Sequence, residues 1–197
     1  IDNYGNVTGL DSNYKGKRYG DIWGYKVERL YQKDDFVYDA DGNLVKEKIT
    51  TGKGAGVEIN KLKDPNAHNQ AYLQSGSLVF GPGDVMYKDL DGDGEITSGD
   101  NTIDSHGDKV VIGNSTPRYQ YSFRIGADWK GVDLSLFFQG IGKCDMWGSS
   151  SLTLAGFNTG DGAIAKRFST DYWREDRTDA FYPRAVNMGN GTNSFNM

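Results

Sequence analysis

The segment YQYSFRIGADWK, residues 119–130, carries the clearest periodic pattern of the 197-residue chain. Apolar side chains occupy the odd positions from Tyr119 to Trp129, and polar residues or glycine occupy the even positions from Gln120 to Lys130. Successive side chains of a β-strand point to opposite faces of a sheet, so this alternation predicts a strand with one apolar and one polar face.

A second alternating segment follows directly, with only a Lys-Gly turn between the two. In VDLSLFFQGIG, residues 132–142, one face carries Val132, Leu134, Leu136 and Phe138. The two segments predict an antiparallel hairpin over 117–142 in which both strands contribute to a single apolar face.

Two architectures use such a hairpin. In a soluble β-sandwich the apolar face covers a core, whereas in an outer-membrane β-barrel it faces lipid and the polar face lines a lumen. The first strand, Tyr119 to Trp129, has the length of about 9–11 residues that a tilted membrane strand needs. Its aromatic ends lie where barrels have interfacial aromatic girdles, but the alternation alone fits both architectures.

Composition favours β structure in the rest of the chain. Hydrophobic residues make up 37%, and the 12 Tyr, 9 Phe, 4 Trp and 27 Gly indicate strands joined by many turns. The net charge of −5 is spread over interspersed acids and bases without a basic stripe, so we expect no nucleic-acid partner. No constellation of catalytic residue types is visible, and we expect no enzyme.

Other segments have weaker patterns. Residues 18–32 predict one strand, and residues 36–45 predict a small hairpin around an Asp-Gly-Asn turn. Residues 46–83 predict a long loop with a short strand at SLVF. Residues 162–176 predict a short helix with Ile164, Phe168 and Tyr172 on one face. The chain starts at Ile1 and ends in the polar run NGTNSFNM, so we expect it to be a segment of a longer polypeptide.

The segment DLDGDGEITSGD, residues 89–100, has the spacing of a twelve-residue calcium loop. Such a loop supplies oxygen ligands from positions 1, 3, 5, 7, 9 and 12 and turns sharply at a glycine in position 6. Gly94 occupies position 6, and the ligand positions hold Asp89, Asp91, Asp93, Glu95 (through its carbonyl), Thr97 and Asp100. We expect these six residues to bind a structural Ca²⁺ ion, the alternative being a solvated acidic turn.

This loop departs from an EF-hand in two ways. Position 12 holds Asp100 where a longer Glu is usual, and neither flanking segment is an amphipathic helix. The prediction is therefore an isolated structural loop and not a calcium sensor.

Three segments resemble SusC-like TonB-dependent outer-membrane transporters (the SusC/RagA family). They are YGDIWGYKVERLYQ at 19–32, PGDVMYKDLDGDGEIT with VVIGNSTPRYQYSFRIGADWKGVDLSLFFQGIGKCDMW at 82–97 and 110–147, and DYWREDRTDAFYPRAV at 171–186. Their order along the chain is that of the family, and residues 33–80 are unlike it.

The resemblance implies an all-β fold, namely a partial outer-membrane β-barrel of antiparallel hairpins with long extracellular loops. Residues 1–197 would be one segment of the C-terminal region of a barrel of about 22 strands. Within it, 18–32 would be a barrel strand, 33–116 an extracellular loop carrying the metal loop 89–100, 117–142 a barrel hairpin and 143–197 a further extracellular loop.

The function that the resemblance implies is import of oligosaccharides, or of peptides, across the outer membrane of a Gram-negative bacterium. The implied partners are a SusD-like lipoprotein, outer-membrane lipid, and the TonB complex, which would act through parts of the transporter outside this chain. The alternative is a secreted, calcium-stabilised β-domain that binds glycans through exposed aromatic side chains. The candidates are Trp147, Tyr172, Trp173 and Phe181, for which we favour packing within the loops over stacking on sugar rings.

Overall fold

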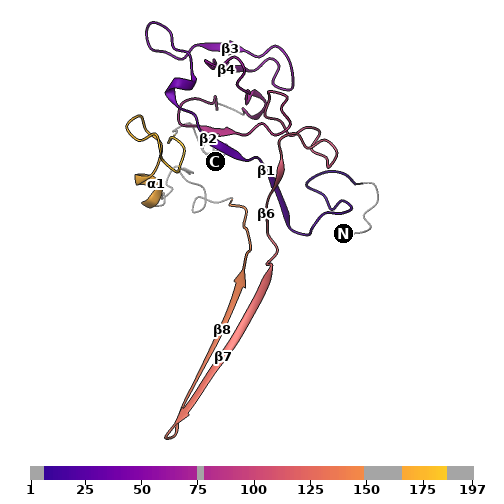
Figure 1. Cartoon of the computed structure of the whole chain (residues 1–197), viewed down its shortest axis with the longest axis vertical. Helices are drawn as coiled ribbons and strands as arrows, with labels where there is room; N and C mark the ends of the chain where they lie inside the picture. Colours follow the sequence, from indigo (N-terminus) through magenta and orange to yellow (C-terminus); the bar gives the residue numbers. More distant parts are fainter. Residues whose placement is uncertain (1–6, 75–77, 149–165, 186–197) are drawn as a thin grey trace. The chain divides into compact units, whose positions relative to one another are not determined.

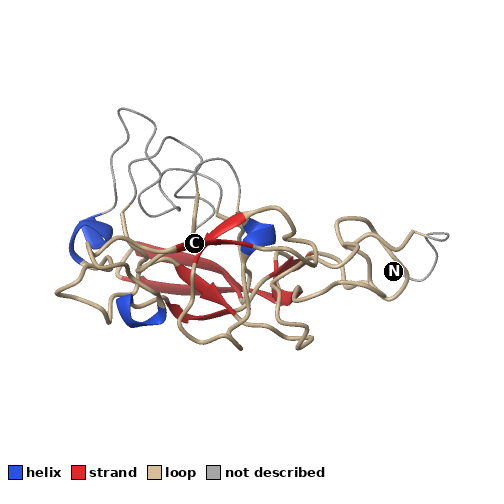
Figure 2. Cartoon of the chain, turned by 90° about the horizontal axis from the view of Figure 1, so that it is seen from above, coloured by secondary structure: helices blue, strands red, loops and turns tan. Residues whose placement is uncertain are grey.

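The computed structural model describes residues 7–74, 78–148 and 166–185 of the chain. Nearly all of its regular structure is β, as the composition predicted. The strands are β1 (Asp21–Gly24), β2 (Val27–Leu30), β3 (Lys46–Lys48), β4 (Glu58–Asn60), β5 (Val85–Tyr87), β6 (Val110–Asn114), β7 (Tyr119–Trp129) and β8 (Val132–Gly142). The helices are short: two 3-10 turns, η1 (Lys33–Asp35) and η2 (Ala71–Leu73), and α1 (Lys166–Thr170), drawn in blue in Figure 2.

The strands pair two by two into four small sheets, β1 with β6, β2 with β5, β3 with β4, and β7 with β8. None of these sheets closes into a barrel within the described residues. No helix in the part of the chain that the structure describes is long and apolar enough to cross a membrane. The chain divides into two compact units, one combining residues up to Gly24 with Val111–Trp147, the other combining Tyr25–Val110 with the residues after Trp147.

The long hairpin of the first unit has the register that the alternation predicted. Every residue of β7 opposes one of β8, from Tyr119 with Gly142 to Trp129 with Val132 (Figure 1). The turn residues Lys130 and Gly131 have φ of 50° and 84°. Two positive φ values give a type I′ turn, whose twist matches that of the flanking strands.

Cross-strand partners share a face, so the two apolar patterns merge into one surface. Phe123 and Phe138 stack across it with their ring centroids 4.7 Å apart. At the open end, the Tyr119 and Tyr121 rings lie over Gly142 and Gly140, where no side chain would fit. The other members of this surface are Ile125, Ala127, Trp129, Val132, Leu134 and Leu136.

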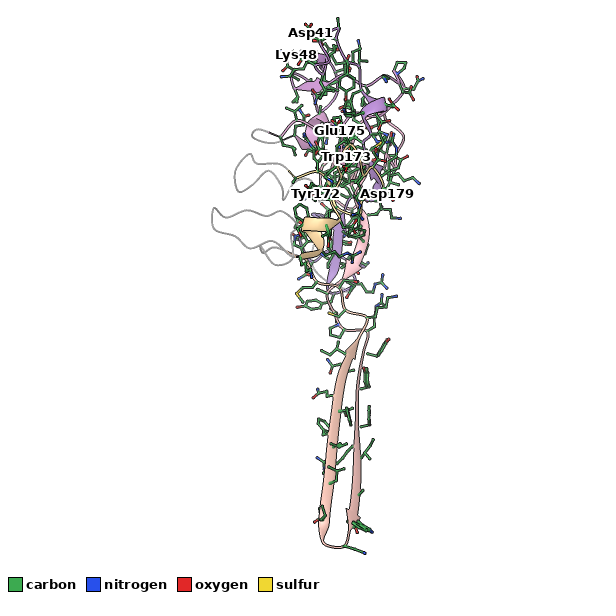
Figure 3. All side chains as sticks on the ribbon, turned by 90° about the vertical axis from the view of Figure 1, so that its left-hand side faces the viewer. Asp41, Lys48, Tyr172, Trp173, Glu175 and Asp179 are labelled. Carbon is green, nitrogen blue, oxygen red and sulfur yellow. The ribbon has the colours of Figure 1, made fainter. Side chains whose placement is uncertain are left out.

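This apolar surface is exposed. Its large side chains keep between 41% (Leu136) and 70% (Trp129) of their area accessible, so nothing among the described residues covers it. Figure 3 shows the hairpin's side chains projecting to both sides of the ribbon. The opposite face carries mainly polar groups, including Gln120, Ser122, Arg124, Asp128 and Asp133.

The rest of the first unit is held together by Asn114 at the end of β6. Its amide Nδ2 donates to the Tyr19 carbonyl (3.0 Å) and to Asp21 Oδ1 (2.7 Å). Its main-chain N–H donates to Asp145 Oδ2 at 2.8 Å. The buried Asn114 thus holds residues 19–21 through its side chain and Asp145 through its main chain, because each lost hydrogen bond would leave a desolvated polar group.

The core of the second unit consists of two hydrophobic clusters on either side of β5. Tyr31, Phe36, Leu78, Phe80 and Met86 form the first, and Val85, Tyr87 and Ile96 form the second. Alternate residues of a strand point to opposite faces, so Met86 contributes to one cluster and its neighbours to the other. Leu73 of η2 packs against both clusters.

The strand predicted for residues 18–32 is instead two short strands with different partners. β1 pairs with β6, and β2 pairs with β5. The break follows Gly24, where an added Cβ would lie 2.5 Å from Ile112 Cδ1. Tyr25 then packs its ring against Tyr87, with centroids 5.5 Å apart. These tertiary contacts override the local alternation.

The prediction of a long loop over 46–83 is wrong in part, because β3 and β4 form an antiparallel ladder inside it. That ladder follows directly on the small hairpin predicted at 36–45, whose Tyr38–Leu44 bridge is present. The SLVF segment forms no strand at its described residues, although Leu78 and Phe80 are buried. The helix predicted within 162–176 is confirmed in part at α1, which ends before Tyr172, although the Phe168 and Tyr172 rings lie 5.6 Å apart; Ile164 lies outside the described residues.

Residues 166–185 are anchored to the second unit by a buried ion pair. Arg184 Nε and Nη2 donate to the two carboxylate oxygens of Asp84 at 2.5 and 2.7 Å. Asp84 is fully buried and also accepts the Gly81 N–H at 2.7 Å. Trp173, labelled in Figure 3, donates its indole N–H to Gln32 Oε1 at 3.2 Å. The GPGDV and YPRAV segments, distant in sequence, are thus in direct contact.

Candidate metal centre

Three carboxylates gather at one point of the second unit. Asp89, Asp91 and Asp108 each offer an oxygen within 4.8 Å of the oxygens of the other two. Ca²⁺ binds oxygen at about 2.3–2.6 Å, so two ligands of one ion lie at most about 5 Å apart. The three side chains therefore have the chemistry and spacing to share one calcium ion.

The loop from residue 89 to 97 curls as its spacing predicted. The Asp89 carboxylate accepts the N–H groups of Gly92 (2.6 Å) and Gly94 (3.0 Å). These glycines have φ of 77° and 86°, a left-handed conformation that glycine adopts without a Cβ penalty. Asp91 and Asp93 each accept the N–H two residues further on, at 3.2 and 2.8 Å, which is the Asx-turn geometry.

Ile96 fastens this loop to the core. Its side chain is fully buried in the cluster with Val85 and Tyr87. Its main-chain N–H donates to the Asn69 carbonyl at 2.9 Å, and the Asn69 N–H donates to the Gly94 carbonyl at 2.9 Å. The apolar residue at position 8 of the loop therefore orders the backbone on which the acidic side chains stand.

Asp108 is the site residue that the sequence analysis missed. It is fully buried, and its two carboxylate oxygens accept the N–H groups of Leu90 (2.7 Å) and Thr97 (2.8 Å). Its own N–H donates to the Thr97 carbonyl at 3.0 Å. Asp108 thereby ties the start of the acidic loop to its ninth position. The only local signal was a Gly-Asp dipeptide, which recurs elsewhere in this chain.

The remaining predicted ligands lie outside this three-carboxylate cluster. Asp93, Thr97 and Asp100 line an open hollow together with Asp91. Thr97 is buried, and its hydroxyl accepts the Gly99 N–H at 3.2 Å. The Asp100 side chain is 75% exposed and lies 3.5 Å from Lys53 Nζ. The Glu95 carboxylate accepts the Lys53 N–H at 2.9 Å. The loop pattern assigns the main-chain carbonyl of Glu95, and not its carboxylate, to the ion.

The electrostatics of the cluster favour a cation. Burial raises the pKa of Asp91, and the nearby carboxylates of Asp108, Asp93 and Asp89 raise it further, against a lowering by the Asp93 N–H. Mutual repulsion among carboxylates disfavours the ionised form of each one, and a bound divalent cation removes that cost.

The aromatic candidates for glycan binding are not equivalent. Trp173 is buried and packs against Gly83, so it serves the fold. Trp147 and Phe181 are 62% and 69% exposed. Arg167 lies over the Phe181 ring, 5.2 Å from its centroid, and Arg174 lies at the same distance over Tyr172.

Comparison of the chain with protein-family models, with curated proteins and with solved structures finds no match in any of the three.

Proposed function

We propose that this chain is part of the wall and outer loops of a TonB-dependent outer-membrane importer of oligosaccharides or peptides in a Gram-negative bacterium. In this proposal β7 and β8 are neighbouring strands of a larger barrel, and residues 33–116 and 143–197 belong to extracellular loops. A SusD-like lipoprotein and the TonB complex are the proposed partners. The observation that carries the proposal is the exposed apolar face of the hairpin.

Such a face is unfavourable in water. Soluble proteins seldom expose a contiguous apolar surface of this extent unless it binds something. The strands have the length that a tilted membrane strand needs, and Tyr119, Tyr121 and Trp129 lie near the two ends, as in an aromatic girdle. The opposite face, with Gln120 and Ser122, suits a wet lumen. A barrel wall, with lipid on one side and a wet lumen on the other, satisfies both faces at once.

The proposal is also supported by the contact between Asp84 and Arg184. The segments that resemble the transporter family include GPGDV and YPRAV, and the buried ion pair joins these two segments. A shared structural purpose explains why both segments occur together in one chain, although they are far apart in sequence.

Leu136→Arg tests the membrane-facing assignment. Leu136 opposes Ile125 near the middle of the hairpin, on the apolar face. An arginine at the lipid midplane of a barrel costs about 2–4 kcal/mol. We expect this variant of the polypeptide that contains the chain to be depleted from the outer-membrane fraction, as measured by immunoblotting and by heat-modifiable gel mobility.

Ser135→Arg is the matched control. Ser135 is the adjacent residue on the polar face, opposite Gly126, so the same substitution there should leave membrane assembly near the parental level. Equal recovery of both variants in the membrane would contradict the proposal. Recovery of the parental protein in the soluble secreted fraction, with a loss of solubility in Leu136→Arg, would favour the secreted glycan-binding domain.

For the loop, we propose a structural calcium ion held by Asp89, Asp91 and Asp108, the three carboxylates that lie together, whereas the further predicted ligands Asp93, Glu95, Thr97 and Asp100 lie outside this cluster. The ion would limit the conformational freedom of an acidic loop and would take no part in chemistry. The close approach of the three carboxylates is the observation that supports it.

Calcium should protect the loop from proteolysis. The calcium concentration required for this protection should be at least about tenfold higher for Asp91→Asn than for the parental chain. Because the pKa of Asp91 is raised, protons compete with the ion, and we expect the calcium requirement to increase as the pH falls into the acid range. Limited proteolysis in calcium and in EGTA, followed by mass spectrometry, measures both effects.

Asp41→Asn is the control, because Asp41 is an exposed acid in the turn next to Asp39 and is not one of the three clustered carboxylates. Asp100→Asn tests whether the ligand that the loop pattern predicts at position 12 binds the ion. A loss of calcium protection as large as that of Asp91→Asn would mean that Asp100 is a ligand. Protection that is equal in calcium and in EGTA for the parental chain would eliminate the calcium proposal.

A further inference from the structure

The first unit contains a cationic hollow at the open end of the long hairpin. Its lining includes Arg18, Arg118 and Lys143 together with Asp21 and Asp145. Arg118 immediately precedes β7 and Lys143 immediately follows β8, and the Arg118 N–H donates to the Lys143 carbonyl at 3.2 Å. The hairpin register therefore places these two cations side by side.

The two acids of the hollow already have partners. Asp21 accepts the Asn114 amide at 2.7 Å and lies 3.5 Å from Arg18 Nε. Asp145 accepts the Asn114 N–H at 2.8 Å. Within the described residues, Arg118 and Lys143 form no ion pair with either acid. Arg118 and Lys143 therefore keep their side-chain nitrogens available to a ligand, in a hollow whose three basic and two acidic residues leave a net charge of +1.

The pair stands at the open end of the hairpin. Arg118 and Lys143 lie immediately outside the Tyr119–Gly142 pair, where Lys143 leaves the extended conformation with a φ of 49°. In the proposed barrel this end of the hairpin leads into the extracellular loops. The two cations would then stand at the outer end of the import path, where cargo arrives.

A second hollow in the same unit shares Asp21 with the first. It has a volume of about 340 Å³, and its lining includes Trp23 and Trp147. Ligand pockets have volumes from about 300 Å³ upward, and flat aromatic side chains offer a stacking surface to a ring. The same lining includes Asp11, Lys17 and Asp21, so the hollow combines two indole rings with polar side chains that can bond the hydroxyl groups of a sugar ring.

We propose that Arg118 and Lys143 bind the carboxylate of an acidic sugar in the cargo, and that Trp147 stacks on an adjoining sugar ring. This inference rests on the proposed import function and narrows its cargo to uronate-containing oligosaccharides. The planar guanidinium of Arg118 can take a carboxylate through two parallel hydrogen bonds, and Lys143 adds a compact charge beside it.

The probe is tetragalacturonate, titrated calorimetrically onto the full chain in detergent. The Arg118→Gln/Lys143→Gln variant should bind it at least about tenfold more weakly, and the affinity of the parental chain should fall as salt rises from 50 to 500 mM. Lys130→Gln, at the other end of the hairpin, is the matched control and should bind as the parental chain does. Trp147→Ala should weaken binding of tetragalacturonate but not of acetate.

Neutral tetragalactose and tetraglutamate distinguish the outcomes. Tetragalactose binding as tightly as tetragalacturonate, or an unchanged affinity in the double variant, would overturn the inference. If tetraglutamate binds as tightly as tetragalacturonate, the ligand is an anionic peptide and not an acidic sugar, which would also overturn the inference. Absence of tetragalacturonate binding by a chain whose hairpin passes the Leu136→Arg membrane test would refute this inference alone and leave the proposed import function standing.

Discussion

Arg184→Met is expected to destabilise the second unit by about 3–5 kcal/mol, because it leaves the fully buried Asp84 carboxylate without its cation. The guanidinium contacts both oxygens of Asp84, and the main-chain N–H of Arg184 donates to the Gly83 carbonyl at 2.8 Å. Only the side-chain interaction is lost in the variant. Urea unfolding followed by tryptophan fluorescence measures the change, since Trp173 is the one tryptophan of this unit.

Arg174→Met is the matched control. Arg174 lies on the same segment and pairs with Asp176 at 3.2 Å, but both side chains are substantially exposed. An exposed pair contributes at most about 1 kcal/mol, so this variant should unfold near the parental midpoint. Equal shifts for Arg174→Met and Arg184→Met would show that the buried pair has no special part in holding residues 166–185.

Asp84→Asn combined with Arg184→Gln completes the experiment. A neutral amide pair keeps hydrogen-bonding capacity at both positions and removes the buried charge. We expect the double variant to be more stable than Arg184→Met alone. The difference between the two separates the cost of an uncompensated charge from the cost of lost packing.

The long hairpin was predictable because everything that specifies it is local. A strict period of two fixes which side chains share a face, and the two-residue turn at Lys130-Gly131 fixes the register. The curl of the acidic loop was predictable for the same reason, because Gly92, Gly94 and the Asx turns of Asp91 and Asp93 act within a few residues.

Contacts between residues far apart in the chain could not be predicted from local sequence patterns. The segment 18–32 alternates like one strand, but β6 and β5 lie about 60 to 90 residues further along the chain and divide it between two partners. Asp108 shows the same limit. Gly83-Asp84, Gly99-Asp100 and Gly107-Asp108 are the same dipeptide, yet Asp84 pairs with an arginine, Asp100 is exposed and Asp108 accepts main-chain N–H groups from the acidic loop.

Gly107 allows the backbone turn that brings Asp108 to the acidic loop. Gly107→Ala is therefore expected to cause the second large loss of stability. Gly107 has a φ of 55°, and an added Cβ would lie 2.5 Å from the Gly99 nitrogen and 2.6 Å from the Thr97 carbonyl oxygen. Both contacts are main-chain atoms, which cannot swing away as a flexible side chain can. Left-handed strain of about 1–2 kcal/mol and overpacking of about 1–3 kcal/mol together predict a loss of about 2–5 kcal/mol in stability.

Gly107→Ala also tests whether the position of Asp108 matters for calcium binding, because the substitution removes no carboxylate. If Asp108 completes the calcium site, Gly107→Ala should abolish calcium-dependent protection from proteolysis although Asp89, Asp91 and Asp108 are all retained. Gly42→Ala is the control for backbone strain, since Gly42 has a φ of 83° and no atom within 4 Å of an added Cβ. It should lower stability by only about 1–2 kcal/mol and leave calcium protection unchanged. Full calcium protection in Gly107→Ala would mean that the loop binds its ion through residues 89–100 without Asp108.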